Sequence, residues 1–326
     1  MYVMQCRQGD VGFVGARAEL VPYRNIELSP CSGVLNYGQG LIGGLKVYRR
    51  PSSDASGRTG YVLFRPEENA RQMQVGASRM CMPAPSVEQF VNAVKQTVLA
   101  NSRWVPPQGK GALYIRPLLI GSGPILGMAP APEYTFIIYA TPIGAYFKAS
   151  AQEDFSAINL LVEEEFHRAF LGGTGGVKAI TNYAPVLKAQ VDGKSKGFAD
   201  VLYLDSVHKR YVEEASSSNL FIVKGGAIAT PKMAGTILPG ITRSSTIQLA
   251  RDQGYKVRFI ISGTTFLQLI KTWKRSVSAT KQVEKRLVCI DDLLTADEVF
   301  CTGTAVCITP VSTVSYKGTR FFQLAQ

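Results

Sequence analysis

The pattern of apolar and polar positions predicts alternating strands and helices in the first half of the chain. Short runs rich in β-branched and aromatic residues, which are typical of strands, occur at YVLFRP (61–66), ALYIRPLLI (112–120) and YTFIIYATP (134–142). SVEQFVNAVKQTVLANSRW (86–104) instead repeats apolar residues at helical spacing, and it opens with the Ser86 and Gln89 pattern of a capping box. This mixture indicates an α/β or α+β fold.

The second half repeats the mixture after a polar stretch at about 145–155. Helices are expected at KAITNYAPVLKAQVDGKSKG (178–197) and ITRSSTIQLARDQG (241–254), and strands at DVLYLD (200–205) and YVEEASSSNLFIVKGG (211–226). At 326 residues the chain is longer than one core usually supports. We therefore expect two domains, residues 1–147 and 148–326.

Composition places the chain among folded proteins outside the membrane. Hydrophobic residues make up 46% and charged residues 18%, and no apolar run reaches the roughly 18 residues of a membrane helix. The start, MYVMQCRQGDVGF, has neither a secretory signal nor a transit-peptide pattern. The chain as given is expected to be cytoplasmic.

Charge and cysteine usage exclude further classes. The net charge is +12, but Arg258, Lys271, Lys274, Arg275 and Lys281 concentrate five of the positive charges in one stretch. Such a local basic segment does not predict a nucleic-acid surface. The six cysteines lack C-x-x-C spacing, which argues against a zinc site or a disulfide framework and favours reduced thiols.

Two weaker signals do not support a function of their own. Residues 38–43 match G-x-G-x-x-G, but no βαβ unit with an acid at the required offset follows, so a turn is preferred to a dinucleotide site. The only histidines, His167 and His208, have no metal-ligand spacing and form no specific catalytic triad. No metal site is expected.

Lys178 is a candidate nucleophile because it lies between a glycine-rich approach and an apolar run. An amine reacts only when unprotonated, and partial burial lowers the pKa of a lysine. The alternative, a lysine that opens a helix with its ammonium in water, is the more common arrangement. Neighbouring features decide between the two.

Those features are a candidate phosphate site and a candidate buried acid. In LPGITRSST (238–246) a Pro-Gly turn leads into a helix, whose free N–H groups could meet a phosphate; CTGTA (301–305) is a second small-residue turn. In YVEEASSSNLF, Glu213 and Glu214 should point to opposite faces of a strand, so that only one looks into a core.

These segments form part of a longer series, in this order: YGQGLIGGLKVYR, LFRPEENA, LYIRPLLIGSG, GGVKAITNYAPVLKAQ, YVEEASSSNLF, TILPGITR and EVFCTGTA. The order and spacing resemble those of branched-chain aminotransferases, particularly the plant enzymes, over nearly the whole chain. The resemblance implies pyridoxal 5'-phosphate fold type IV, with a smaller α/β N-terminal domain, a larger pseudo-barrel domain and a homodimer.

For the cofactor, the resemblance implies named roles. Lys178 would be the catalytic Schiff-base lysine and proton shuttle, Glu214 would partner the pyridine nitrogen, and Tyr183 would support the phenolic oxygen. The phosphate would be held by a set of four residues: Arg65, Thr304 and the backbone N–H groups of Ile241 and Thr242.

For the substrate, the resemblance implies transamination of leucine, isoleucine and valine with 2-oxoglutarate, giving branched 2-oxo acids and L-glutamate. The substrate carboxylate would lie near Tyr114 and the Thr304-Ala305 turn, and Arg116 would receive the second carboxylate of glutamate. The apolar side-chain pocket would be lined by Tyr37, Ile42 and Tyr146. Small molecules, not membranes, are the expected partners.

The sequence departs from the family in three places. The family pattern has Phe-Glu at Ile42-Gly43, and an atypical insertion at about 258–283, interpreted as a retained intron or annotation error, separates GYKV from EKRLVCIDDL. Both ends resemble clipped forms of the family, whose members also work in plastids and mitochondria. The alternatives are an inactive truncated paralogue and another fold-type-IV enzyme, such as a D-amino-acid aminotransferase or aminodeoxychorismate lyase.

Overall fold

The computed structural model describes residues 1–50, 60–144, 157–259 and 282–322. The chain divides into two compact units that interleave in sequence. Unit 1 comprises Met1–Lys148 and Val177–Ala184, and unit 2 comprises Ala149–Gly176 and Pro185–Gln326. The segment that carries Lys178 thus belongs to unit 1, whereas its flanks belong to unit 2.

Unit 1 is built on a seven-stranded antiparallel sheet with the order β2-β1-β7-β6-β4-β5, in which β3 also pairs with β6. Its strands are β1 (Tyr2–Arg7), β2 (Ala18–Leu20), β3 (Gly40–Ile42), β4 (Leu45–Arg49), β5 (Tyr61–Leu63), β6 (Ala112–Gly121) and β7 (Glu133–Ile143). The strands predicted at 112–120 and 134–142 are confirmed as β6 and β7. Of the strand predicted at 61–66, only Tyr61–Leu63 is a strand, because α2 already begins at Pro66.

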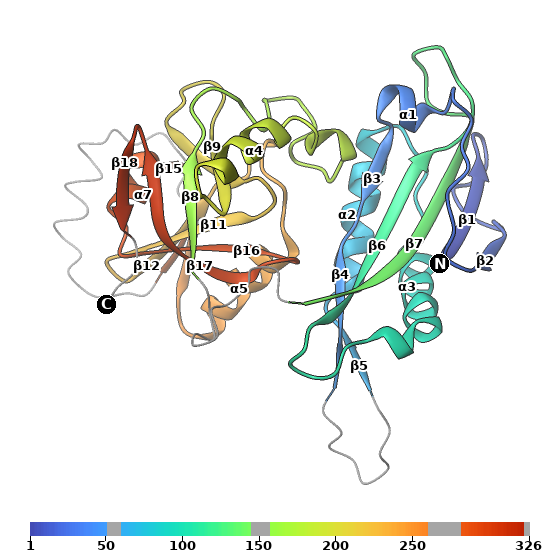
Figure 1. Ribbon diagram of the computed structural model, residues 1–326, viewed down its shortest axis with the longest axis horizontal. Helices are drawn as coiled ribbons and strands as arrows, with labels where there is room; N and C mark the ends of the chain where they lie inside the picture. Colours follow the sequence, from blue (N-terminus) through green and yellow to red (C-terminus); the bar gives the residue numbers. More distant parts are fainter. Residues whose placement is uncertain (51–59, 145–156, 260–281, 323–326) are drawn as a thin grey trace, which may run out of the picture. The chain divides into compact units, whose positions relative to one another are not determined.

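The helices of unit 1 are α1 (Gly33–Tyr37), α2 (Pro66–Arg79), α3 (Val87–Ala100) and the short 3-10 helices η1 (Ser102–Trp104) and η2 (Ile180–Asn182). α2 and α3 contact each other and cover one face of the sheet (Figure 1). The capping box is confirmed, because the Ser86 hydroxyl accepts from the Gln89 N–H at 3.1 Å and Gln89 accepts from the Ser86 N–H at 2.9 Å. Phe90 of α3 packs on Phe136 of β7, with ring centroids 5.7 Å apart, in the core beneath.

Unit 2 contains an 11-stranded sheet with the order β13-β14-β12-β11-β16-β17-β8-β9-β10-β15, and β18 pairs with β17. An additional pairing between β10 and β11 joins β11, β16, β17, β8, β9 and β10 into a closed barrel. The strands are β8 (Ile158–Val162), β9 (Asp200–Leu204), β10 (Tyr211–Ala215), β11 (Asn219–Lys224), β12 (Ala227–Pro231), β13 (Lys256–Phe259), β14 (Gln282–Arg286), β15 (Val288–Cys289), β16 (Glu298–Gly303), β17 (Cys307–Tyr316) and β18 (Thr319–Phe322).

The helices of unit 2 are α4 (Leu187–Ser195), α5 (Ile241–Asp252) and α7 (Ile290–Leu294). α5 confirms the helix predicted at 241–254, and its Ile247 is buried with Phe221 of β11 and Val283 of β14. Within the described ranges, no helix combines the length and the apolar character needed to cross a membrane.

The helix predicted at 178–197 is wrong over its first part. Ala179 forms a β-bridge with Leu41, η2 follows, and the α-helix begins only at Leu187. Pro185 disfavours the helical conformation of the residue before it. Lys178 therefore lies in a turn directly before the bridge at Ala179 and does not open a helix.

The strand predicted at 211–226 is two strands, because the chain turns back between Ala215 and Asn219. The expectation that only one of Glu213 and Glu214 faces a core is also wrong: their exposed fractions are 7% and 3%. The register between β10 and β9 shifts between Val212 and Ala215, and the described part of β10 is buried along nearly its whole length.

The predicted division at residue 147 and the insertion at 258–283 stay predictions. Only the two ends of that insertion are described, and they extend β13 and β14, which pair in parallel with Val257 opposite Val283. Parallel neighbours need a crossover connection, and its residues, 260–281, lie outside the described residues.

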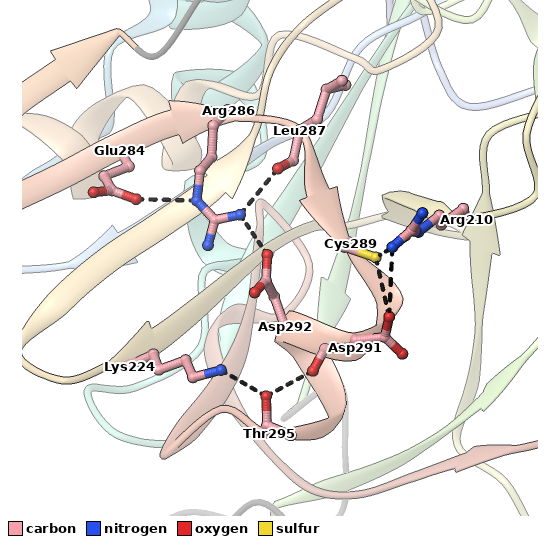
Figure 2. A network of polar contacts seen from close by, with 9 residues as sticks. All are labelled: Arg210, Lys224, Glu284, Arg286, Leu287, Cys289, Asp291, Asp292 and Thr295. Atoms are coloured by element: carbon pink, nitrogen blue, oxygen red, sulfur yellow. Dashed lines mark hydrogen bonds and ion pairs between the residues drawn. The ribbon is translucent and has the colours of Figure 1, made fainter. Parts of the chain in front are cut away.

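A polar network ties β14 to α7 in unit 2 (Figure 2). Arg286 donates to Glu284 at 3.0 Å and to Asp292 at 2.6 Å, and Lys224 of β11 donates to Thr295 at 2.6 Å. Burial lowers the pKa of Arg286, but the hydrogen bonds and charges of Asp292 and Glu284 outweigh it and leave that pKa raised. The network joins elements of one unit to each other, which gives it a structural role.

Candidate active site

Lys178 lies on the edge of the unit 1 sheet, with its amine against a phenol. Its Nζ donates to the Tyr183 hydroxyl at 3.0 Å and lies 5.6 Å from the centroid of that ring. Its carbonyl accepts from the Ile42 N–H at 3.1 Å, beside the bridge from Leu41 to Ala179. Backbone pairing with β3 thus fixes the position of the Lys178 backbone, and Tyr183 orients the amine of this half-buried side chain.

Tyr114 and Arg116 lie two positions apart on β6, so their side chains share a face of the strand. Arg116 Nη2 donates to the Tyr114 hydroxyl at 3.4 Å, and the guanidinium lies 5.4 Å from the ring centroid. The Nε of Arg116 is buried without a hydrogen-bond partner. This pair therefore contains one donor that the protein itself leaves unsatisfied.

The remaining sequence-predicted residues of unit 1 are spread over several elements. Ile42 ends β3, next to the Lys178 carbonyl. Tyr37 ends α1, and its hydroxyl donates to the Leu126 carbonyl. Arg65 precedes α2 in a left-handed conformation, with φ of 47°. Tyr146 lies outside the described residues.

Glu214 is a buried acid of unit 2 that is held by several hydrogen-bond donors. It stands opposite Asn219 where β10 and β11 close the barrel. Its Oε2 accepts from Asn219 Nδ2 at 2.9 Å, and its Oε1 accepts from the Leu238 N–H at 2.9 Å and pairs with Arg168 Nη2 at 2.5 Å. One cation and two N–H donors stabilise the charged carboxylate in this buried position.

Arg168 is a buried partner of Glu214 that the sequence did not reveal. Its side chain is 4% exposed, and it also donates to the carbonyls of Gly175 and Thr236 at 3.3 and 2.5 Å. A lone arginine after the acidic run EEEFH suggests a surface position. The only signal was the buried acid itself, because a buried carboxylate requires a cationic partner.

The N-terminus of α5 is open to an anion. Gly240 precedes the helix in extended conformation, and no side chain caps the N–H groups that follow it, among them those of Ile241 and Thr242. A Cβ at Gly240 would collide with Oδ1 of Asn219. Backbone N–H groups and the positive helix end favour a phosphate here.

Arg243 adds a buried cation to the same first turn. It donates to the Thr230 hydroxyl at 3.1 Å and to the Pro231 carbonyl at 2.9 Å, which anchors α5 to β12. Burial lowers its pKa to about 10. At neutral pH the guanidinium is still charged, so it adds to the positive potential at this helix end.

Thr304 and Ala305 occupy the turn between β16 and β17, where Gly303 pairs with Cys307. The Oγ1 of Thr302, at the base of this turn, is buried without a hydrogen-bond partner. In the described part of the chain, no group of His, Cys, Asp and Glu is suited to hold a metal ion.

Comparison with known proteins identifies the family of this chain. Residues 57–260 match the Amino-transferase class IV family. Branched-chain-amino-acid aminotransferase 3, chloroplastic, of Arabidopsis thaliana is 57% identical over 98% of this chain and 68% of its own length. Branched-chain amino acid aminotransferase 1, mitochondrial, of Humulus lupulus is 51% identical over 98% of this chain and 72% of its own length.

A solved structure shares the fold. The T.th. branched-chain amino acid aminotransferase with pyridoxamine 5'-phosphate is 26% identical, superposes with a TM-score of 0.72, and is matched over 99% of this chain and 87% of its own. The chain belongs to the class IV aminotransferases and, within them, to the branched-chain-amino-acid aminotransferases.

Proposed function

We propose that this protein reversibly transfers the α-amino group of leucine, isoleucine and valine to 2-oxoglutarate, giving branched 2-oxo acids and L-glutamate. As a class IV aminotransferase it depends on pyridoxal 5'-phosphate, which supplies an aldehyde and an electron-accepting pyridine ring when bound. The observation that carries the proposal is the Lys178 amine held 3.0 Å from the Tyr183 hydroxyl.

The residues present fit this cofactor. The uncapped start of α5, preceded by a glycine at which a side chain would collide with Asn219, suits a phosphate. Glu214 is a buried carboxylate paired with the Arg168 guanidinium, and such a pair suits a partner for a protonated ring nitrogen. The N–H groups of Ile241 and Thr242, with Arg65 and Thr304, would hold the phosphate.

Lys178 would perform the covalent and proton-transfer work. Its Nζ would hold the cofactor through the aldehyde group and would serve as the base and acid that moves the proton at the substrate α-carbon. The Tyr183 hydroxyl can accept from the ammonium and donate to the neutral amine. Tyr183 would thereby orient Nζ in both protonation states and support the phenolic oxygen of the ring.

Tyr114 and Arg116 would handle the substrate carboxylates. The buried, unpartnered Nε of Arg116 favours a carboxylate acceptor, which glutamate carries on its side chain. The α-carboxylate would lie near Tyr114 and the Thr304-Ala305 turn. The branched side chain would contact an apolar set that we propose to be Tyr37, Ile42 and Tyr146.

A trapping experiment tests the proposal. The purified chain is mixed with pyridoxal phosphate and reduced with borohydride, and the modified lysine is mapped by mass spectrometry; we expect Lys178. Lys178→Ala should abolish the adduct, whereas Lys188→Ala, at an exposed lysine paired with Asp192, should keep it. An adduct on another lysine contradicts the proposed role, and the absence of any adduct favours a non-catalytic protein.

The substrate class is tested by assay of the holoenzyme with leucine, isoleucine, valine and D-alanine, each with 2-oxoglutarate. We expect activity on the three branched L-amino acids. Activity on D-alanine alone would instead assign the chain to the D-amino-acid aminotransferases.

We further propose that the protein forms a homodimer, which light scattering on the purified holoenzyme would check. The relatives compared above are named chloroplastic and mitochondrial. Imaging of a fluorescent fusion made from the complete transcript decides the compartment.

A further inference from the structure

Thr236, in the segment that precedes α5, is held by two side chains from other parts of unit 2. Its hydroxyl donates to Glu213 Oε1 at 2.5 Å, and its carbonyl accepts from Arg168 Nη2 at 2.5 Å. Thr236 and Glu213 are both buried. A residue in a connecting segment is therefore fixed at both its side chain and its backbone.

Leu238 is held in a similar way by two further side chains. Its N–H donates to Glu214 Oε1 at 2.9 Å, and its carbonyl accepts from Asn219 Nδ2 at 2.9 Å. Asn219 also donates to Glu214 Oε2 at 2.9 Å. One short segment thus contacts the proposed ring-nitrogen partner directly.

The same segment leads through Pro239 to Gly240, the residue before α5. Its position therefore sets two things at once: the donor that Glu214 receives from Leu238, and the start of the helix that would receive the phosphate. A shift of the segment would change the separation between them. Holding that separation constant matters for a ligand that contacts both.

Glu213 takes part in this arrangement although its burial costs free energy of folding. It is 7% exposed, its Oε2 has no hydrogen-bond partner, and its hydrogen bond to the Thr236 hydroxyl uses only Oε1. Burial raises its pKa, against the lowering effects of the Thr236 hydrogen bond and the Arg168 charge, while Asp205 raises it further. Such a group calls for a reason beyond general stability.

We propose that Glu213 is a positioning residue for cofactor binding: as the acceptor of the Thr236 hydroxyl, it fixes Thr236–Leu238 and so keeps Glu214 and the start of α5 in register. The part that concerns the cofactor rests on the proposed function. Glu213 acts as an acceptor, not as a charge. A glutamine, which presents the same carbonyl acceptor without the charge, should replace it.

Hydrogen exchange on the cofactor-free chain tests the positioning itself. In Glu213→Leu and Thr236→Val, which remove the acceptor or the donor at similar volume, amides of residues 236–243 should exchange about tenfold faster. Glu213→Gln and Thr236→Ser keep the hydrogen bond and should stay within about twofold of the wild type. Unchanged exchange in the leucine and valine variants overturns the proposal.

Cofactor affinity, measured by fluorescence titration with pyridoxal phosphate, provides the second readout. The dissociation constant should rise about tenfold in Glu213→Leu and in Thr236→Val, and combining the two should add little, because both remove one hydrogen bond. Loss of affinity in Glu213→Gln equal to that in Glu213→Leu would show that charge matters, which also overturns the proposal.

A matched control separates positioning from general destabilisation. Ser312→Ala removes the hydroxyl that donates to the Ile158 carbonyl at 3.2 Å, also within the barrel of unit 2, and should leave exchange at 236–243 and cofactor affinity unchanged. If the wild type binds no cofactor, the proposed function fails while the exchange data still decide the positioning. If the wild type binds and the variants bind equally, only the positioning fails.

Discussion

At the scale of single residues, two glycines lie against the ends of neighbouring side chains, which an added Cβ would displace. A Cβ at Gly44 would collide with the Tyr114 hydroxyl, and one at Gly240 would collide with Asn219. Neither position has the positive φ that usually explains a glycine. Tyr114 is a proposed substrate contact, and Asn219 donates a hydrogen bond to Glu214, so these glycines leave room for Tyr114 and for a partner of Glu214.

Gly44→Ala should therefore act on substrate binding. The added methyl group displaces the Tyr114 hydroxyl and with it the hydrogen bond from Arg116, so we expect KM for glutamate to rise about tenfold, with a smaller change in kcat. Steady-state kinetics check this. Gly127→Ala, where a Cβ meets nothing within 4 Å, is the control, and equal effects of both variants would contradict the explanation.

Asp205 allows a prediction about pH. Burial raises its pKa, but N–H donors at His208 (2.6 Å), Tyr211 (2.7 Å) and Arg210 (3.0 Å) outweigh burial and bring that pKa from 3.8 to about 2. Because the pKa of Asp205 is lower in the folded protein than in the unfolded chain, its carboxylate stabilises the fold at every pH above 3.8. This stabilisation is lost as the pH falls through the folded-state pKa of about 2.

Asp205→Asn should therefore lower the free energy of unfolding by about 1–2 kcal/mol at neutral pH. The difference from the wild type should shrink as pH falls from 3.8 towards about 2. Urea unfolding at a series of pH values measures it. A difference that stays constant down to pH 2 would show that the charged carboxylate is not responsible.

At the scale of elements, the structure agrees best with the sequence where the signal is local. Helix α3 shows this, because its cap residues and its apolar spacing lie within one segment. The prediction of a helix at 178–197 was wrong over its first part, because the local structure there is determined by a residue distant in sequence: Leu41 of β3 pairs with Ala179. The prediction of one long strand at 211–226 was also wrong. Glu214 and Asn219 pair with each other across a turn, and the serines between them are only a weak signal for that turn.

Removing the α3 cap should have a measurable cost. Ser86→Ala leaves the Gln89 N–H without its side-chain acceptor, and we expect a loss of about 1 kcal/mol in the free energy of unfolding. Thermal unfolding followed by circular dichroism measures it. Ser78→Ala, at an exposed position in α2, should stay within about 0.5 kcal/mol, and an equal loss there would argue against the cap.

At the scale of the whole molecule, the barrel of unit 2 closes at the proposed active-site acid. β10 and β11 meet at the pair Glu214 and Asn219, and the Asn219 side chain donates both to Glu214 and to Leu238. The closure of the barrel and the placement of the acid therefore depend on the same asparagine.

Asn219→Leu should destabilise unit 2 strongly. It leaves Glu214 Oε2 and the Leu238 carbonyl without this donor in a buried region, for which we expect a loss of about 2–4 kcal/mol in urea unfolding. Asn92→Leu, at an exposed position of α3 in unit 1, should change stability by less than about 0.5 kcal/mol. A small effect at Asn219 would mean that strand pairing closes the barrel without this side chain.

The candidate site was predictable to different degrees across the molecule. Lys178 and Tyr183 lie close in sequence, and the structure places them in contact. Arg168 was not predictable, because its partner Glu214 reaches it only through the folded barrel. The burial of both Glu213 and Glu214 was not predicted either. The alternation rule assumes that the strand pairs in regular register and that one face of the sheet is exposed to solvent.

The interleaving of the two units has a genetic consequence. The chain leaves unit 1 after Lys148, returns at Val177 and leaves again after Ala184, so neither unit is a contiguous stretch of the gene. A crossover between two parental genes near codon 148 would put Lys178 of one parent into a unit 1 that otherwise comes from the other parent. Chimeras that preserve whole units must therefore be spliced at three points.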